Sequence, residues 1–515
     1  LENLTMPAIV AAVAAAFSFV SGSVALVALE VGAPIWLAST VAYVTQAAMF
    51  FSVARAISPK PKMSSVRSTG TQVMVQGTAE SHRIVYGQAQ TSGIFYPLGT
   101  SGSSNEYLHF LLIYASHECQ SFGALNIAGE AVTTDGSGNV TSGKYSGLIR
   151  VISHLGAWNQ TVDAQIQSEL GSSFWPSTAR LQGRAYDYVR IKYDQNVSAG
   201  GVPAITRLIQ GRKVYDPRDG TQTASDPTTW KYSNNAALCV ADWVAGVPMK
   251  NGAGNVITPY GFKASWSEFN STDLIEAANI CDESISLSVG GTESRYTCNG
   301  VIQTSATRGD VLDALRSSMI GDVVYVGGAW SIRAGAYRTP TVTITEDDFR
   351  GAISSLQVKP SRKDLFNGVK GTYVNPDNNW QASDFPAYTK RINATSLVAG
   401  NRVQIVTLGT TDFTLIGAAS NTVGTTFTAT GAGSGTGTVE SYIVEDAGER
   451  IWSDVEFPFT TSEATAQRIG KIMLERARQP ISFVAKLKLT ALQIQATDVI
   501  MVNFSRYGWA SKPFR

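Results

Sequence analysis

The feature that most constrains this chain is an apolar block near its N-terminal end. Residues 7–29 and residues 31–54 contain no charged side chain, and only Glu30 stands between them. Each run is longer than the roughly 20 residues that a helix needs to cross the hydrocarbon core of a membrane. The pattern therefore predicts an apolar helical hairpin over residues 1–58.

Two surroundings could bury this hairpin, and the sequence leaves both open. In a membrane, the positive-inside rule would place the C-terminal body in the cytoplasm, because four basic residues follow the block: Arg55, Lys60, Lys62 and Arg67. In an oligomer, the small side chains of residues 11–16 would let helices from several copies pack closely along one axis. A secretory signal peptide fits poorly, because the block opens with Glu2 and is too long.

The charge of the chain limits the classes of partner. Charged residues make up only 16% of the sequence, against roughly 25% in a typical soluble domain, and the formal net charge is +1. A nucleic-acid-binding face needs clustered Lys and Arg to neutralise phosphates, so we expect no specific nucleic-acid binding. A weakly charged surface also repels other copies little, which favours self-association.

The cysteines are expected to be free, buried thiols. No CxxC pair occurs, and Cys239 and Cys281 lie in apolar stretches with a helical pattern, where a free buried thiol is the commoner state. An even number of cysteines also permits two disulfides, so the pairing stays open. The four residues concerned are Cys119, Cys239, Cys281 and Cys298.

Beyond the apolar block the pattern predicts a mainly β protein with few helices, of the α+β class. Short alternating apolar runs separated by Gly, Ser and Asn are typical of β-strands and turns. We predict strands at 71–77, 83–87, 107–115, 185–193 and 206–214. Helices are predicted at 235–245, 274–281, 311–319 and 463–479, with capping-box spacing at Asn270–Asp273 and Thr307–Asp310.

Residues 392–443 stand apart from their surroundings. They contain no Lys, and only Arg402, Asp412 and Glu440 carry charge. Thr, Gly and Val dominate, and strand-like pieces occur at 402–408, 413–416 and 425–430. We interpret the segment as a small β-module inserted into a surface loop, an insertion that costs little because loop-closure entropy grows only logarithmically with length.

Two sequence clusters suggest ligand chemistry at first sight. His117, Glu118 and Cys119 are adjacent and could ligate a metal, but neighbours in a strand point to opposite faces and would not converge on one ion. The glycine-rich run 431–437 suggests a phosphate loop, yet no Lys-Ser/Thr follows it and no helix is predicted after it. A flexible hairpin tip is the preferred interpretation of that run.

No arrangement typical of an enzyme is found. Asp347 and Asp348 could serve a glycosidase, but a solvated turn is the simpler interpretation. The tripeptide Arg308-Gly309-Asp310 is better explained by Asp310 acting as a capping-box acid. The sequence therefore predicts no catalytic, cofactor-binding or metal-binding residue and a protein that is not an enzyme.

Several stretches of the body follow one another in the order of a known viral family. They include VYGQAQ from Val85, LIQGRKVYDPR from Leu208, NNAALCVAD from Asn234 and FPFTTSEATAQRIGKIMLERAR from Phe457. This order resembles the hub region of phage tail-tip proteins, the tip attachment protein J family of siphophage central tail hubs. The chain departs from the family pattern at Ala236, where relatives carry proline.

The resemblance implies a domain order. Residues 59–234 would form the first hub β-domains and 235–391 the first part of a baseplate-hub-like domain. The inserted module 392–443 would follow, and 444–515 would close the hub domain of a chain that continues further.

The resemblance also implies a function and partners. It suggests a homotrimeric ring at the virion tail tip, assembled in the host cytoplasm, that caps the tail tube. The expected partners are the distal tail protein, the tape measure protein and receptor-binding proteins. Residues 7–54 would plug the channel or enter the host membrane. The alternatives are a membrane-anchored bacterial surface or envelope binding protein and, less favoured, a cell-wall-degrading enzyme.

Overall fold

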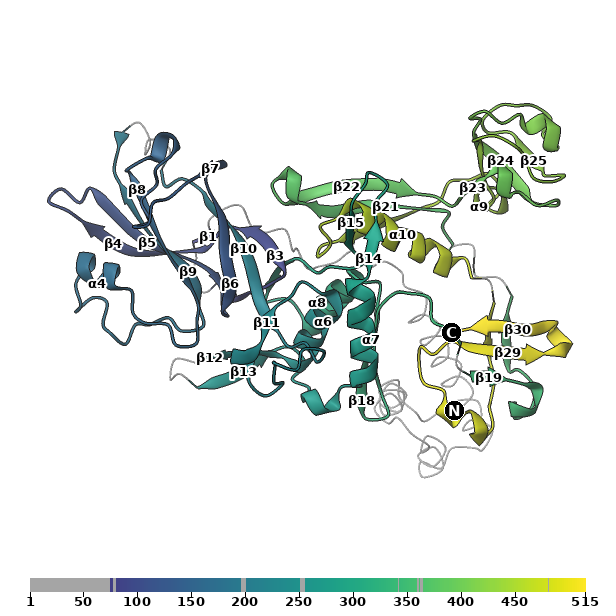
Figure 1. Cartoon of the computed structure of the whole chain (residues 1–515), viewed down its shortest axis with the longest axis horizontal. Coiled ribbons are helices and arrows are strands. Elements are labelled where there is room, and N and C mark those ends of the chain that lie inside the picture. Colours follow the sequence, from purple (N-terminus) through teal and green to yellow (C-terminus); the bar gives the residue numbers. More distant parts are fainter. Residues whose placement is uncertain are drawn as a thin grey trace, which may run out of the picture. The chain divides into compact units, whose positions relative to one another are not determined.

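The computed structural model describes residues 75–76, 80–195, 201–250, 255–340, 342–358, 361, 365–479 and 481–515. The structure is 38% strand and 21% helix, and strands dominate the view in Figure 1. This confirms the predicted mainly β fold with few helices. The hairpin predicted over residues 1–58 lies outside the described residues. Within them, no helix combines the length and the apolarity needed to cross a membrane.

The chain divides into two compact units. In the smaller unit the described residues form one ladder, in which β20 (Ser355–Gln357) pairs antiparallel with β28 (Ser482–Val484). The larger unit comprises residues 61–350, 365–478 and 487–515, and it holds every other element described below.

Two β-sheets form the first part of the larger unit. Their strands are β1 (Val75–Gln76), β3 (Gln88–Thr91), β4 (Ile94–Ser101), β5 (Tyr107–Ala115), β6 (Cys119–Ile127), β7 (Glu130–Val132), β8 (Ile149–Leu155), β9 (Ala185–Lys192), β10 (Ile205–Val214) and β11 (Lys231–Tyr232). One sheet has the order β1-β4-β5-β9-β8, and the other has the order β11-β10-β6-β7, with β3 also paired to β10. Buried side chains of both sheets form one core, which we call the sheet core.

The predicted strands of this part are largely confirmed. The prediction 107–115 matches β5, 185–193 matches β9, and 206–214 matches β10. The prediction 83–87 matches β2 (Arg83–Tyr86), and of 71–77 only β1 is described. On β9, Tyr186 and Tyr188 join Ile166 of the short helix α4 (Ala164–Leu170) in a separate apolar cluster.

The helices gather around a second core, which we call the helical core. It contains α6 (Ala236–Ala245), α7 (Ser271–Asp282) and α8 (Arg308–Ser317), which match three predicted helices. Helix α6 begins because the Asn235 side chain accepts hydrogen bonds from the backbone of Ala237 and Leu238, and it ends at Gly246. Hairpins around the helices pair β12 (Val247–Lys250) with β13 (Val256–Tyr260), β14 (Ser284–Ser286) with β15 (Thr292–Ser294), and β17 (Asp322–Val326) with β18 (Ala329–Arg333).

One two-stranded ladder belongs to both cores. Strand β2 pairs antiparallel with β16 (Gly300–Gln303). Because successive side chains of a strand point to opposite faces, Ile84 and Tyr86 lie in the helical core whereas Val85 lies in the sheet core. On β16, Ile302 likewise lies in the helical core and Val301 lies in the sheet core. We call this pair of strands the shared ladder.

The last helix packs on a third sheet. This sheet has the order β22-β21-β27 and consists of β21 (Gly368–Asn375), β22 (Gln381–Tyr388) and β27 (Trp452–Phe457). Helix α10 (Glu463–Ala477) matches the predicted helix 463–479 and runs beside β21 and β22 (Figure 1). Its buried residues Ala466, Ile469 and Met473 follow helical spacing and join the helical core. Three further strands, β19 (Val342–Ile344), β29 (Ile500–Phe504) and β30 (Trp509–Phe514), form a separate sheet.

Residues 391–440 form a four-stranded sheet with its own core. The order is β23-β26-β24-β25, from β23 (Arg391–Asn393), β24 (Arg402–Thr407), β25 (Thr426–Thr428) and β26 (Thr438–Glu440), and the short helix α9 (Tyr442–Glu445) follows. The strand predicted at 413–416 is wrong, because Phe413–Ile416 is a 3₁₀ helix. The predicted hairpin tip at 431–437 is also wrong. Strands β25 and β26 lie on opposite sides of β24, so the glycine run crosses the sheet.

Candidate functional site

Helix α7 supplies one wall of a cavity at the surface of the larger unit. Asn270 caps the helix: its side-chain oxygen accepts from the backbone N–H of Asp273 at 3.2 Å, and its Nδ2 donates to the Asp273 carboxylate at 3.3 Å. The face that carries Leu274, Ala277 and Cys281 is buried in the helical core. The opposite face of α7 is therefore free to line a surface groove.

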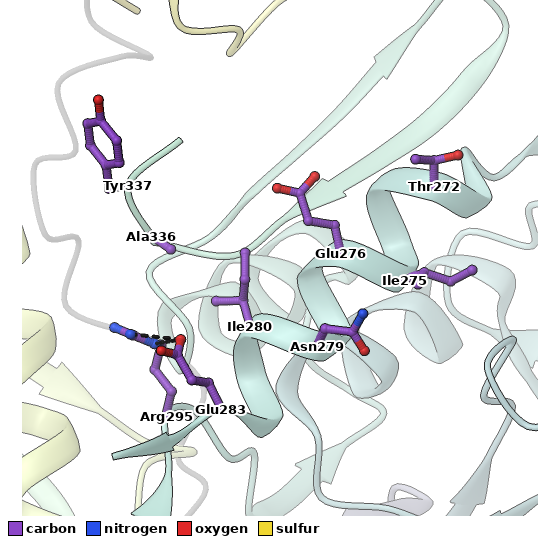
Figure 2. Close-up of a pocket in the computed structure, with 9 residues that line it drawn as sticks. All are labelled: Thr272, Ile275, Glu276, Asn279, Ile280, Glu283, Arg295, Ala336 and Tyr337. Atoms are coloured by element: carbon purple, nitrogen blue, oxygen red, sulfur yellow. Dashed lines mark hydrogen bonds and ion pairs between the residues drawn. The ribbon is translucent and has the colours of Figure 1, made fainter. Parts of the chain in front are cut away.

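The groove has a volume of about 870 Å³. Figure 2 shows α7 along one side, with Tyr337 and Ala336 on the segment that follows β18 and with Arg295 below. We call it the α7 groove. It is lined by Thr272, Ile275, Glu276, Asn279, Ile280, Glu283, Arg295, Ala336 and Tyr337.

The charged residues of the α7 groove are all ion-paired. Glu283 accepts hydrogen bonds from Arg295, whose Nη2 lies 2.8 Å from the carboxylate, and Figure 2 draws this pair. Glu276 pairs with Arg338, which also lies 3.6 Å from Asp273. Opposite charges held side by side cancel much of each other's field, so the groove presents little net charge.

A buried arginine fixes the first turn of α7 from below. Arg333 on β18 donates to Asp273 at 3.3 Å and to Asp498 at 2.7 Å, and it is 7% exposed. Breaking such a pair would leave a buried charge without a partner, which is strongly destabilising. The network therefore holds the N-terminal end of α7 to β18 and to the segment before β29.

The arrangement suits contact with a partner surface. Ile280 lies near Ala336, whereas Ile275 lies on the other side of Glu276 and Asn279 (Figure 2), and Tyr337 has 84% of its surface exposed. Such a mixture of apolar and polar side chains is common on protein contact surfaces.

The three adjacent residues of the suspected metal cluster point to different partners. His117 accepts a hydrogen bond at Nε2 from the backbone N–H of Val85 at 2.9 Å, and Glu118 pairs with Lys213 at 2.6 Å. Cys119 is buried, 4.0 Å from His117 Nδ1. Burial lowers the pKa of His117 to about 3 and raises the pKa of Cys119. In the described ranges, no group of three His, Cys, Asp or Glu residues is arranged to hold a metal.

The remaining residues considered from the sequence have local structural roles. The Asp348 carboxylate accepts a hydrogen bond from the backbone N–H of Thr345 at 2.9 Å, and this contact caps a short 3₁₀ turn. The same carboxylate also accepts a hydrogen bond from the Thr490 hydroxyl. Arg308–Asp310 forms the first turn of α8, where Thr307 accepts from the Asp310 backbone. In the glycine run, the backbone N–H of Gly437 donates to Thr411 at 2.8 Å, so the run is fixed within its sheet.

The prediction of buried free thiols is confirmed. Cys119 lies in the sheet core, and the other three cysteines lie in the helical core. Burial raises the pKa of Cys281 to about 12 and raises that of Cys239 well above its ordinary value.

Two features were not found from the sequence. One is the α7 groove, for which Ile275 and Ile280 on the polar face of a helix were the available signal. The other is a buried ion pair between Arg212 and Asp242. These residues lie on different elements, so no local pattern connects them.

Comparison with known proteins identifies a fold. No family model matches the chain. One similar solved structure is a chain of the virion of a native gene transfer agent particle, at 13% identity over 94% of this chain and 93% of that chain, with a TM-score of 0.50. Another is the 43 kDa tail protein of prophage MuSo2 from Shewanella oneidensis, at 12% identity, with a TM-score of 0.22. That match covers 84% of this chain and 92% of the tail protein. The second score is too low to carry an argument, whereas the first shows a shared fold.

Proposed function

We propose that the chain is a structural protein of a phage-type virion tail and forms part of the hub at the tail tip. The observation that carries the proposal is the fold shared with a virion chain over nearly the full length of both chains. The sequence resemblance to tail-tip hubs points independently to the same class of protein. Motif order is a property of the sequence, whereas the shared fold is a property of the three-dimensional arrangement.

The surface chemistry of the described residues agrees with a structural role. The α7 groove combines aliphatic side chains and an exposed tyrosine with ion-paired charges, as contact surfaces do. A net charge of +1 favours association with other copies and other proteins over binding to nucleic acid. We therefore propose a non-enzymatic protein that acts through its contacts.

The finer features of the proposal come from the family resemblance. The chain would form a homotrimeric ring that caps the tail tube, with the distal tail protein, the tape measure protein and receptor-binding proteins as neighbours. Residues 7–54 would plug the channel or reach the host membrane. Their uncharged sequence supports this role, since three apolar hairpins on one axis would bury their small side chains against one another.

Immunogold electron microscopy of particles purified from producing cells tests the virion assignment. We expect label at the end of the tail distal to the capsid. Label on the capsid, or the absence of the protein from purified particles, would contradict the proposal. Retention of the protein in host membranes after an alkaline wash, without any in particles, would favour a membrane-anchored surface protein instead.

The mass of the purified full chain tests the trimer. Three copies of the 54.9 kDa chain give about 165 kDa. Light scattering coupled to size exclusion, with the detergent contribution subtracted, should return that mass. A monomeric mass at micromolar concentration would contradict the trimeric ring. It would not bear on the virion assignment, which the electron microscopy tests separately.

A further inference from the structure

A second, smaller cavity lies where distant parts of the larger unit meet. Its volume is about 270 Å³, equal to roughly nine water molecules in the liquid. Residues of β3, β15, the segment before α6, the segment before β16, the turn between β21 and β22, and the segment before α10 line it. Because the walls come from six separate segments, we call it the junction cavity.

The walls of the junction cavity are held in place by hydrogen bonds. Glu293 accepts from Ser462 at 2.6 Å, from Thr465 at 3.0 Å and from Arg468 at 3.0 Å. Asn299, which is 6% exposed, accepts from the backbone N–H of Gln88 at 2.9 Å and donates to Thr461 at 2.9 Å. These groups are fixed before any ligand arrives, which lowers the entropy lost on binding.

Two amides that line the cavity remain available for a ligand. The side chains of Gln88 and Asn234 are half-buried, and neither makes a hydrogen bond to another described residue. A primary amide offers two donors and one acceptor oxygen. These side chains can therefore both give and accept hydrogen bonds inside the cavity.

An aromatic ring supplies the apolar wall. Trp380 lines the cavity and is 8% exposed. Its φ of 59° and the φ of 49° at the preceding Asn379 both lie in the left-handed region, which side chains other than glycine rarely adopt. Both residues form the tight turn between β21 and β22, where positive φ is the usual geometry, and this turn places Trp380 at the cavity. The exposed part of the indole offers an apolar contact for the C–H groups of a ligand.

The charge of the lining favours a neutral ligand over an anion. The cavity has one carboxylate, Glu293, and no Lys, Arg or His among its lining residues. Arg468, which is not part of the lining, pairs with Glu293 at 3.0 Å, so the lining offers no cation to a phosphate or carboxylate ligand. The amides, the hydroxyl groups and the ring instead match a small neutral molecule with several hydroxyl groups and one apolar face.

We propose that the junction cavity binds a neutral hexose, either free or as the end of a glycan. Its apolar face would pack against the part of Trp380 that is exposed in the cavity, and its hydroxyl groups would bond to Gln88 and Asn234. Pockets for larger ligands occupy about 300–1,000 Å³, so the volume accommodates about one sugar ring. The proposal does not depend on the tail assignment.

Saturation-transfer difference NMR on the full chain tests the proposal. The probes are D-glucose, D-galactose and N-acetyl-D-glucosamine, each alone, with inorganic phosphate tested as a competitor. We expect saturation transfer to at least one sugar with a dissociation constant on the order of 1 mM, typical of a ligand of this size. The proposal would be overturned if none of the three sugars received saturation at a concentration of about ten times that dissociation constant. Displacement of a bound sugar by phosphate would also overturn it.

Variants place the binding at the cavity. The double variant Gln88→Ala with Asn234→Ala should bind at least tenfold more weakly, while the structure is retained because these side chains hold no other described residue. Trp380→Phe keeps a ring and should lose less affinity than Trp380→Ala. Gln120→Ala, which removes an exposed amide from β6, is the matched control and should bind normally. Equal binding by the double variant and the control would overturn the proposal.

Discussion

Replacing Asp242 with asparagine removes one charge from a fully buried ion pair. Asp242 on α6 is 0% exposed, and it accepts from Arg212 of β10 through Nε at 2.7 Å and Nη2 at 3.1 Å. It also accepts from the hydroxyl of Tyr86 on β2 at 2.5 Å. Burial, reinforced by Asp242, raises the pKa of Tyr86 well above 10.0, so the hydroxyl remains a donor at neutral pH.

The expected loss of stability is large because the arginine stays where it is. Asparagine keeps the shape of aspartate, whereas Arg212, whose side chain is 5% exposed, would hold a positive charge without a counterion. Removing one partner of a buried pair costs about 3–5 kcal/mol. For a cooperative unit of 150–250 residues, each kcal/mol lowers Tm by about 2–4 °C, which gives a fall of roughly 6–20 °C.

Thermal unfolding of the full chain at pH 7, followed by near-ultraviolet circular dichroism, measures this loss. A control variant replaces all three groups, with Tyr86→Phe, Arg212→Met and Asp242→Leu. Because it leaves no unpaired buried charge, it should recover most of the lost stability. A fall in Tm below about 2 °C for Asp242→Asn would refute the reasoning. So would a triple variant no more stable than the single one.

Three other predictions follow from packing, burial and charge. Gly211→Ala should destabilise the chain by about 1–3 kcal/mol, because the added Cβ would lie 2.2 Å from the Val85 carbonyl oxygen. Gly309→Ala is the control: with open space around the added Cβ, it should be neutral or stabilising by up to about 1 kcal/mol. The midpoints of urea unfolding compare the two variants. Since the pKa of His117 falls from 6.5 to about 3 in the folded chain, the unfolded chain binds more protons below pH 6.5, and stability should decline as pH falls from 6.5 toward 3. His117→Gln should flatten that decline in urea titrations at several pH values, and an unchanged slope would argue against it. The buried thiols should resist Ellman's reagent in the native chain and all four should react in guanidinium; rapid reaction of the native chain would contradict their burial.

The helices could be predicted because their signals are local. Asn235, Asn270 and Thr307 each cap a helix in the structure, and the apolar stripe of α10 lies in the core as its spacing indicates. Strands β5 and β9 were equally clear from their β-branched and aromatic residues. Such signals need only neighbouring residues, so no knowledge of the fold was required.

The wrong strand at 413–416 shows how a short apolar run misleads. Phe413 and Ile416 are buried three residues apart, whereas Leu415 is 78% exposed, and this spacing fits a 3₁₀ turn. The Asp412 carboxylate accepts from the backbone N–H of Thr414 at 3.0 Å and fixes the turn. A local side-chain bond to the backbone therefore outweighed the strand propensity of the run.

The sites could not be predicted because distant segments build them. Arg212 and Asp242 are 30 residues apart, and Glu293 and Ser462 of the junction cavity are 169 apart. The register that brings such residues together depends on the packing of whole sheets and helices. The sequence could indicate only that Ile275 and Ile280 are apolar residues on the polar face of α7.

The shared ladder has a consequence for the time that the chain needs to fold during synthesis. Gln88 follows β2, and its partner Asn299 precedes β16, 211 residues later. At about 5–20 residues per second, a ribosome needs roughly 10–40 s to make the intervening chain. Throughout that interval the sheet core lacks Val301 and the helical core lacks Ile302, so both cores are incomplete. The helical core also needs residues as far as Leu474, so the sheet core can be completed first during synthesis.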